Sequence, residues 1–337
     1  MAADVLVVGT GLIGASLGLA LRAGADVVLA DASPDALEHA VRRGAGRRWD
    51  GAERARVAVV CTPVPVVAAE LARLQTAACA RTYTHVASVQ GPVQRAAERA
   101  GCAVETLCGG HPMAGRERGG PGAAAADLFS GRTWVLCPAP GTRREAVRDV
   151  TEVVEAVGAT PVTRGVEEHD AAVALVSHLP QVAAYALAAR LLDGDAAAVA
   201  LAGPGLQDST RLAGSDPDLW RDVLRLNAGN VAPLVRALGD ELRGVADALD
   251  DGDRLEHVVD LLRRGRQGRE RVPVKRGERG AAFGGVAVSV PDRPGQLAAL
   301  LTTAAQAGVN VEDVRVDHVP GTPRGVIELS VRADARR

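Results

Sequence analysis

The stretch Val5–Gly14, VLVVGTGLIG, predicts the fold of the first half of the chain. Its first four residues, Val5–Val8, form a short continuous apolar run, as a buried parallel strand does. A GxGxxG pattern follows at once, and leucines at helical spacing continue it at Leu17 and Leu21. Strand, glycine-rich turn and helix in this order are typical of the opening of a dinucleotide-binding βαβ unit.

The turn contains three glycines, Gly9, Gly11 and Gly14, and each has a predicted role. Gly9 permits a tight turn, Gly11 lets the backbone approach a pyrophosphate, and Gly14 allows the helix to pack closely. The helix begins at Leu12 and Ile13, where free N–H groups and the positive end of the helix dipole would face the phosphates.

A second strand is predicted at residues 26–30, and Asp31 ends it 22 positions after Gly9. An acid at this place accepts hydrogen bonds from the ribose hydroxyls of adenosine and repels a 2′-phosphate. The combined pattern predicts a Rossmann domain that binds NAD in preference to NADP. The alternative is an ordinary βαβ turn with an incidental acid.

Two later segments are predicted to end strands at the edge where doubly wound sheets bind ligands. Residues 55–67 contain a buried strand that ends at Thr62 and Pro63, in a loop that would pass under the nicotinamide half of the cofactor. Residues 84–91 contain another strand end, which carries Ser88. Ser88 is a candidate functional residue, and a simple turn residue is the alternative.

The composition predicts a soluble cytoplasmic protein of two or three domains. Of its 337 residues 47% are hydrophobic but only 2% aromatic, so Ala, Val and Leu are expected to fill the cores. A formal net charge of −2 gives no overall attraction to nucleic acid or membranes. No continuous apolar run reaches the roughly 18 residues of a membrane span, and we expect no signal peptide. The five cysteines form no CxxC pair, so we expect buried small residues and no metal site.

The glycine-rich segment Gly109–Leu136 contains His111 and little that could pack into a core. The following Pro112 restricts His111 to extended geometry, and the glycines around it would leave the imidazole accessible. A catalytic histidine and an ordinary surface histidine are both compatible with this segment taken alone.

A long apolar helix is predicted to open with Glu-His-Asp at residues 168–170 and to contain Ser177, His178 and Pro180. Pro180 removes a backbone hydrogen bond and is expected to kink the helix. Asp170 and His178 lie two i, i+4 steps apart and therefore share one face. A polar pair beside a kink predicts a lined cavity, and a core histidine is the alternative.

Residues 202–227 place Arg211 in a glycine-rich connection between two predicted helices. Ser215 and Asp216 precede Pro217, which is a typical start of a helix. A guanidinium holds a carboxylate through two parallel hydrogen bonds. Arg211 is therefore a candidate for binding an acidic substrate, and a surface ion pair is the alternative.

Together these motifs resemble, in order and spacing, the prephenate/arogenate dehydrogenase family of tyrosine biosynthesis. The resemblance runs from about Val5 to Leu262 and rests on GTGLIGASLGLALR (9–22), SVQG (88–91), GGHPMAG (109–115), SHLP (177–180) and TRLAGSDPDLW (210–220). It implies an α/β Rossmann domain at residues 1–160, an all-α substrate and dimerisation domain at residues 161–264, and hence a homodimer.

The resemblance also implies an NAD-dependent oxidative decarboxylation of prephenate to 4-hydroxyphenylpyruvate, in which hydride leaves the ring carbon that bears the hydroxyl. His111 matches the family's catalytic histidine and would accept the hydroxyl proton, since an imidazole ordinarily titrates near neutrality. Ser88 would orient His111. Arg211 would bind a substrate carboxylate, and His178 and Ser177 would line the pocket.

The sequence departs from the family at places that bear on substrate choice. Family members often read Asp-x-x-Ser-x-Lys where this chain has His85, Ser88 and Gln90. They often have serine or threonine in place of Arg116, and a second histidine in place of Gln181. A neutral Gln90 in the substrate pocket predicts relaxed preference for a dianion, unless Arg116 compensates. Arogenate and 4-amino-4-deoxyprephenate therefore remain alternatives to prephenate.

The C-terminal part begins with a basic stretch, residues 263–280, that holds eight basic and two acidic residues. A helix end with a linker at residues 265–282 is favoured over a nucleic-acid-binding arm, because the stretch has no aromatic residues. Residues 283–337 resemble a partial α+β ACT regulatory domain that lacks its last helix and strand. Such a domain would bind tyrosine or phenylalanine near residues 292–296 and Asn310. A non-catalytic sensor of NAD and amino acids is the alternative of another class.

Overall fold

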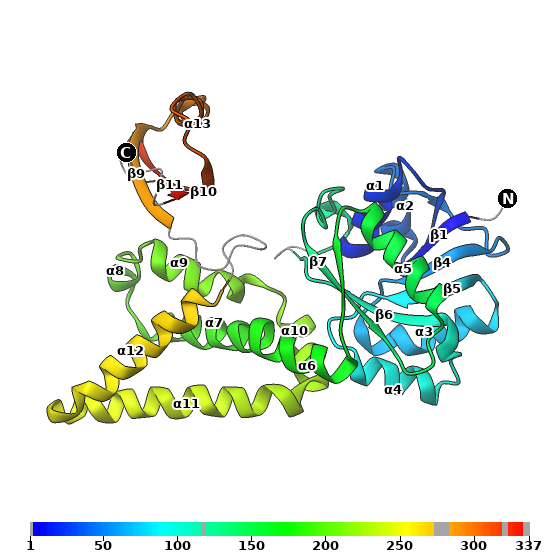
Figure 1. Cartoon of the computed structure of the whole chain (residues 1–337), viewed down its shortest axis with the longest axis horizontal. Helices are drawn as coiled ribbons and strands as arrows, with labels where there is room; N and C mark the ends of the chain where they lie inside the picture. The colour runs from blue at the N-terminus through cyan, green and yellow to red at the C-terminus, as the bar shows by residue number, and fades with distance from the viewer. Residues whose placement is uncertain (1–2, 116–118, 273–282, 319–322, 333–337) are drawn as a thin grey trace. The chain divides into compact units, whose positions relative to one another are not determined.

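The computed structural model describes residues 3–115, 119–272, 283–318 and 323–332. The chain divides into two compact units, Met1–Leu238 and Gly239–Arg337. Figure 1 labels the helices and strands of both. The first unit contains the glycine-rich turn and every candidate catalytic or cofactor-binding residue that the structure describes.

An eight-stranded sheet with the order β3-β2-β1-β4-β5-β6-β7-β8 forms the centre of the first unit. All neighbouring strands are parallel except β6 and β7, which are antiparallel. The order reverses between β1 and β4, as in a doubly wound dinucleotide-binding sheet, so the predicted Rossmann fold is confirmed. The strands are β1 (Ala3–Val8), β2 (Val27–Ala30), β3 (Arg47–Arg48), β4 (Ala55–Val60), β5 (Ala80–His85), β6 (Leu107–Pro112), β7 (Thr133–Pro138) and β8 (Thr160–Thr163).

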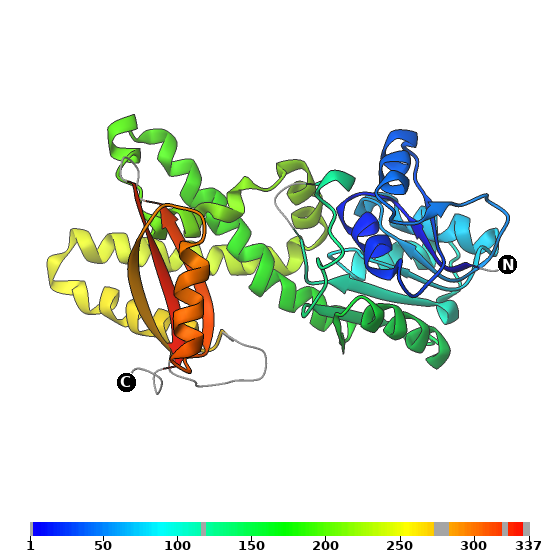
Figure 2. The ribbon, with the colours of Figure 1, turned by 90° about the horizontal axis from the view of Figure 1, so that it is seen from above.

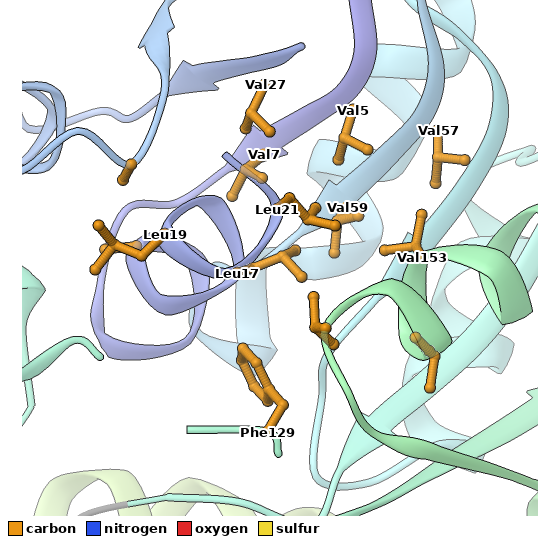
Figure 3. Close-up of a cluster of buried hydrophobic side chains, with 14 of the residues drawn as sticks. Val5, Val7, Leu17, Leu19, Leu21, Val27, Val57, Val59, Phe129 and Val153 are labelled. Atoms are coloured by element: carbon orange, nitrogen blue, oxygen red, sulfur yellow. The ribbon is translucent and has the colours of Figure 1, made fainter. Parts of the chain in front are cut away.

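Helices cover both faces of this sheet, and the alternating side chains of each strand pack against them. Leu17 and Val153, from helices on one face, point toward the valines of β1 and β4 (Figure 3). That face carries α1, α2 and α5, and the opposite face carries α3 and α4. The bounds are α1 (Leu12–Leu21), α2 (Pro34–Arg42), α3 (Val64–Thr76), α4 (Gly91–Arg99) and α5 (Arg144–Ala156).

The cores consist mainly of Val, Leu and Ala, as the composition predicts. Two of the few aromatic residues, Phe129 and Trp134, are nevertheless fully buried, with ring centroids 5.2 Å apart. All five cysteine thiols are free; four are buried as expected, and Cys61 is half-buried.

The structure corrects two sequence predictions about strands. The strand predicted within residues 55–67 ends at Val60, and Val64 already begins α3, because Pro63 and Pro65 suit the first turn of a helix better than a strand interior. The glycine-rich segment Gly109–Leu136 was expected to contribute little to a core, but its first residues belong to the largely buried strand β6 (Leu107–Pro112).

A helical region follows the sheet and contains the predicted long apolar helix. That helix consists of α6, a π-helical turn at Ala174–His178, and α7. The π turn ends two residues before Pro180, and the chain continues directly into α7. The helix is therefore irregular near the place where the sequence predicts a kink. The bounds are α6 (Val166–Val173), α7 (Leu179–Arg190), α8 (Ala196–Val199), α9 (Pro204–Thr210), α10 (Pro217–Leu226) and α11 (Ala228–Asp250).

By length and composition alone, the continuous helical stretch Val166–Asp193 could cross a membrane, with a mean hydropathy of 1.5. A core or interface helix of a soluble protein passes the same test. This stretch holds His169, Asp170 and His178 on its buried face. Only 28% of its most apolar 18-residue window is buried.

The second unit contains the end of α11, α12 (Leu255–Glu270), β9 (Phe283–Pro291), α13 (Gln296–Gln306), β10 (Val311–His318) and β11 (Arg324–Arg332). Helix α12 extends six residues into the predicted linker, and Arg264, just before the linker, pairs with Glu241 and Asp260. The three strands form an antiparallel sheet in the order β10-β11-β9, and α13 packs on the face of Ile327 and Leu329 (Figure 2).

Candidate active site

The carboxylate of Asp170 joins two helices at the centre of the site. Its Oδ1 and Oδ2 accept hydrogen bonds from the backbone N–H groups of Gln90 and Gly91, at 2.8 and 2.9 Å. These amides begin α4, whose N-terminus has no side-chain cap of its own. A helix N-terminus stabilises an anion through its unpaired N–H groups and its dipole. Burial raises the pKa of Asp170, but the hydrogen bonds from His169, Gln90 and Gly91 outweigh burial and lower this pKa below its usual range.

Two histidines extend from this carboxylate in a chain of hydrogen bonds. Nδ1 of His169 lies 2.9 Å from Oδ1 of Asp170, and Nε2 of His169 lies 2.9 Å from Nδ1 of His111. An ionised carboxylate only accepts hydrogen bonds, so Nδ1 of His169 carries the proton. Nε2 of a neutral His169 then accepts a hydrogen bond from Nδ1 of His111. The chain therefore leaves Nε2 of a neutral His111 as an acceptor nitrogen.

Strand β6 brings His111 to the chain because two glycines precede it. A Cβ on Gly109 would lie 2.4 Å from Oε1 of Gln90, and a Cβ on Gly110 would lie 2.9 Å from Nε1 of Trp134. Both glycines are buried and His111 is half-buried. The glycines thus allow close packing of β6, and the imidazole that they were predicted to leave accessible is half-buried.

The surroundings keep His111 uncharged at neutral pH. Burial and the neighbouring imidazoles of His169 and His178 lower the pKa of His111 to about 3, while the nearby Asp170 acts in the opposite direction. A neutral imidazole is the form that accepts a proton. Because Asp170 stabilises positive charge along the chain, a proton taken up by His111 is partly compensated.

His178 lies at the end of the π-helical turn and is only 1% exposed. The amide nitrogen of Asn227 lies 3.2 Å from Nδ1 of His178 and donates to the backbone carbonyl of Asp170 at 2.8 Å. The ring of Trp220 meets that of His178 edge-on, with centroids 5.8 Å apart. The predicted open cavity beside His178 is therefore filled by protein, and His178 fixes α7 against α10. Burial lowers the pKa of His178 to about 4.

Helix α7 also anchors the turn that carries Arg211. The buried side-chain amide of Gln181 donates to the carbonyl of Leu212 at 2.6 Å, and the hydroxyl of Tyr185 donates to the carbonyl of Ser215 at 2.5 Å. Arg211 begins this turn, and its side chain is exposed. Gln181, one of the departures from the family pattern, thus positions the segment that presents Arg211.

The glycine-rich turn fits the pyrophosphate of a dinucleotide. Gly9 has φ +96°, and a Cβ there would lie 2.8 Å from the carbonyl carbon of Cys61 at the end of β4. A Cβ on Gly14 would lie 1.9 Å from the carbonyl oxygen of Gly9. A Cβ on Gly11 would meet no described atom within 4 Å. Two glycines are therefore required by the fold itself, whereas Gly11 faces open space, as the predicted approach of a phosphate requires.

Two further residues at this edge of the sheet fit NAD. Oδ2 of Asp31 accepts hydrogen bonds from the N–H and the hydroxyl of Thr10, at 2.5 and 2.8 Å, and Oδ1 accepts one from the N–H of Ser33 at 2.8 Å. A carboxylate has about four acceptor sites, so it has capacity for a ribose hydroxyl. The hydroxyl of Thr62, just after β4, is buried with no hydrogen-bond partner in the described part of the chain.

Gln90 contacts the histidine chain in a way that the sequence did not predict. It is 2% exposed, and its side-chain amide donates to two backbone carbonyls, one of them that of Gly110 at 3.1 Å. The prediction that Gln90 contacts substrate is corrected, because its donors are committed to the protein backbone. Ser88 lies on the same loop, and among the described contacts no hydrogen bond joins it to His111, whose Nδ1 is paired with His169 instead.

The sequence placed Asp170 on the helix face of His178, but it did not indicate His169 or Asn227 as site residues. The sequence did contain a signal for a buried polar cluster, because the pair His169-Asp170 and Asn227 adjoin apolar helices. Polar side chains buried beside such helices need hydrogen-bond partners. Ser177 is half-exposed beside His178, and Pro63 is exposed beside Thr62. Arg116 lies outside the described residues. Within the described ranges, no group of three or more His, Cys, Asp or Glu side chains is placed to hold a metal ion.

Comparisons with known proteins agree with this arrangement. The prephenate dehydrogenase nucleotide-binding domain matches residues 17–163, and the prephenate dehydrogenase dimerization domain matches residues 165–264. Probable prephenate dehydrogenase NovF of Streptomyces niveus is 40% identical over 339 residues, which cover 97% of this chain and 93% of that protein. Prephenate dehydrogenase of Bacillus subtilis (strain 168) is 25% identical over 346 residues, which cover 99% of this chain and 93% of that protein.

Two solved structures share the fold at 26% sequence identity. Prephenate dehydrogenase from A. aeolicus, in complex with hydroxyphenyl propionate and NAD+, superposes with a TM-score of 0.71 over 80% of this chain and 98% of that chain. Synechocystis arogenate dehydrogenase superposes with a TM-score of 0.66 over 80% of this chain and 100% of that chain.

The first prediction separates the two functions of the glycine-rich turn. Gly11→Ala should leave the melting temperature unchanged, because the added methyl meets no described atom within 4 Å, yet weaken NAD binding about tenfold or more by occupying the phosphate approach. Gly14→Ala should instead lower stability by about 1–3 kcal/mol or more through overpacking. Calorimetric NAD titration and thermal unfolding measure both effects. Full NAD affinity in Gly11→Ala would show that phosphates do not approach there.

The second prediction concerns cofactor choice at Asp31. Asp31→Ser should narrow the preference for NAD over NADP, because it removes both an acceptor for the ribose hydroxyls and a charge that repels a 2′-phosphate. The measurement is the ratio of the two dissociation constants. Asp35→Ser, at an exposed position on the first turn of α2, is the control and should leave the ratio unchanged. Equal affinity of the wild type for both cofactors would contradict the reading of Asp31.

Proposed function

The chain belongs to the prephenate dehydrogenase family, and on that premise we propose that it catalyses NAD-dependent oxidative decarboxylation of prephenate to 4-hydroxyphenylpyruvate. Arogenate and 4-amino-4-deoxyprephenate are the alternative substrates for the same site. The observation that carries the proposal is the hydrogen-bonded chain from Asp170 through His169 to His111. It ends on an acceptor nitrogen, and the reaction needs one to take the proton of a ring hydroxyl.

The histidine chain supplies the proton acceptor. Nε2 of His111 would accept the hydroxyl proton as the ring carbonyl forms, and the imidazole would become positively charged. Its Nδ1–H already donates to His169, and Asp170 stabilises positive charge through His169. The protein thus holds the base in one tautomer and offsets the charge that develops on it, which is how positioned general bases lower a barrier.

The redox chemistry belongs to the cofactor. NAD, when bound, supplies the acceptor for the hydride that leaves the ring carbon. The residues that would hold it are the turn Gly9–Gly14 with Leu12 and Ile13, the ribose acceptor Asp31, and the loop at Thr62 and Pro63. Loss of carbon dioxide from the ring then leaves an aromatic product, which makes the overall step essentially irreversible.

Substrate binding is proposed for the residues around this chain. Arg211 would hold a carboxylate, since a guanidinium pairs with it bidentately. Ser88 would orient the imidazole of His111, as the family resemblance implies, and Ser177 would line the pocket. With Gln90 committed to the backbone, the charge on the substrate side chain would be sensed at Arg211, which does not by itself distinguish prephenate from arogenate.

The C-terminal unit and the surroundings of the enzyme complete the proposal. The order of β9, α13, β10 and β11 supports an ACT-like module, with tyrosine or phenylalanine as its candidate effector. We propose the cytoplasm as the location, with no membrane partner. We also propose no nucleic-acid partner, because Arg264 and its neighbours on α12 pair with acidic residues of the same unit.

A second copy of this chain would cover the apolar surface of the helical region. Its exposed apolar side chains include Leu175, Val176, Leu187, Leu192 and Leu201. Exposed apolar surface is typical of interaction sites, and the family's dimerization domain matches residues 165–264. This supports a homodimer in which the apolar face of Val166–Asp193 is buried between subunits rather than in lipid.

The third prediction tests the reaction and its base together. Wild-type protein mixed with NAD+ and prephenate, arogenate or 4-amino-4-deoxyprephenate should produce NADH with at least one of them, and the values of kcat/KM rank the three. His111→Asn should lower turnover by about 10²–10⁴-fold, because the general base is lost, while NAD affinity stays intact. Near-normal turnover in His111→Asn would remove this histidine from the mechanism, and absence of NADH with every substrate would favour the sensor alternative.

The fourth prediction follows from the lowered pKa of His111. The base works only when neutral, and its pKa is shifted from 6.5 to about 3, so lowering the pH protonates it only far below neutrality. We therefore expect kcat/KM to stay level as the pH falls through 6.5, and to decline only at markedly more acidic pH. A pH profile with NAD binding followed in the same buffers measures this. An acidic limb centred near 6.5 would show that the imidazole is not desolvated in the working enzyme.

The fifth prediction concerns the subunit contact. Leu192 is 88% exposed, and burying such a side chain contributes about 1.5–3 kcal/mol, so Leu192→Glu should weaken dimerisation about tenfold or more. Sedimentation at a series of protein concentrations gives the dissociation constant. Val66→Glu, an exposed apolar position on α3, is the matched control and should leave the mass unchanged. A wild type that sediments as a monomer throughout would overturn the homodimer.

A further inference from the structure

Gln90 donates hydrogen bonds to Asp170, at one end of the histidine chain, and to Gly110, the residue before His111 at the other end. Its backbone N–H donates to Oδ1 of Asp170 at 2.8 Å, the same oxygen that lies 2.9 Å from Nδ1 of His169. Its side-chain Nε2 donates to the carbonyl of Gly110 at 3.1 Å, one residue before His111. One residue thus bridges the helix that supplies the carboxylate and the strand that supplies the base.

The side chain of Gln90 is held in a single arrangement. Its second amide hydrogen is used by the carbonyl of Ala87 at 2.8 Å, and the residue is 2% exposed. A Cβ on Gly109 would lie 2.4 Å from Oε1 of Gln90, so strand β6 packs directly against the side-chain amide of Gln90. A buried amide with both hydrogens committed costs free energy to displace, because its partners would be left unpaired.

The contact between His111 and His169 depends on this bridge. The two residues are 58 positions apart in the sequence, on β6 and α6, and meet at 2.9 Å. Catalytic rates fall steeply when reacting groups are misplaced by even about 1 Å. We propose that Gln90 is a positioning residue that keeps His111 within hydrogen-bonding distance of the His169–Asp170 pair. This inference rests on the proposed function only in taking His111 as the base.

Three substitutions, at the N-cap of α4 and within it, distinguish the effect of the hydrogen-bond donors of Gln90 from the effect of its side-chain volume. Gln90→Met keeps the length of the side chain but removes both donors. Gln90→Lys keeps donors at the end of a stem of similar length and should restore much of the activity that the Met variant loses. Gln94→Met, one helical turn later, removes an amide that donates to Glu98 instead, and it is the matched control. If the Met variant does not fold, Gln90→Asn replaces it, since its amide is one methylene too short to reach Gly110.

A double-mutant cycle with His169→Gln identifies the route by which Gln90 acts. In the wild-type background Gln90→Met should lower kcat between about tenfold and a hundredfold, with the KM for NAD unchanged. In the His169→Gln background the same change should cost less than about twofold, because the contact that Gln90 maintains is already gone. An equal loss of kcat in both backgrounds would overturn the proposal, since a purely structural effect is additive.

A titration that needs no turnover keeps this test independent of the reaction. The pKa of His111, followed by NMR of the imidazole in the full-length protein without substrate, should change on Gln90→Met in the wild-type background but not in the His169→Gln background. If no substrate yields NADH while the titration behaves in this way, the proposed function fails and the positioning role stands. If the pKa of His111 is the same with and without the Gln90 amide, the positioning role fails.

Discussion

The buried carboxylate of Asp170 is the interaction on which the rest of the site depends. This carboxylate accepts hydrogen bonds from two backbone amides at the start of α4 and from the imidazole N–H of its sequence neighbour, His169. The helix terminus stabilises the negative charge, so the Asp170 carboxylate stays ionised inside the protein. An ionised carboxylate cannot donate a hydrogen bond, so it dictates the tautomer of His169 and, through it, that of His111. A single charge therefore sets the direction of a chain that ends on the proposed base.

Close packing of small residues makes that chain possible. With only 2% aromatic residues, the sheet is packed by Val, Leu and Ala, and strands approach their neighbours closely where glycines permit it. Gly109 and Gly110 admit the side chains of Gln90 and Trp134 against the strand that carries His111. A larger residue at Gly109 would push β6 away from the start of α4, and one at Gly110 would collide with Trp134 of β7. The glycines therefore act on the chemistry through distance rather than through flexibility.

The π-helical turn and α7 together anchor the helical segments that follow them. His178, at the end of the π turn, contacts Asn227 and Trp220, and Gln181 and Tyr185 of α7 donate hydrogen bonds to the carbonyls of Leu212 and Ser215. The π-helical turn before α7 inserts one residue, as happens often at functional sites. The departure from the family at Gln181 therefore acts on the position of the turn that carries Arg211, the residue proposed to hold a substrate carboxylate.

The sequence by itself determined the parts whose physical cause is local. The run Val5–Val8, the glycine spacing and Asp31 specify a βαβ unit because backbone freedom and hydrophobic period are properties of neighbouring residues, and the helix face shared by Asp170 and His178 follows from helical spacing. It also indicated His111, through a family resemblance rather than through any local signal. Only the tertiary structure decided that His111 meets His169, that Gln90 is a buried bridge rather than a substrate contact, and that His178 is enclosed. Those outcomes depend on which strand ends and helix termini come together across separations of 20 to 80 residues, and no local pattern encodes a distance between elements that pack from distant parts of the chain.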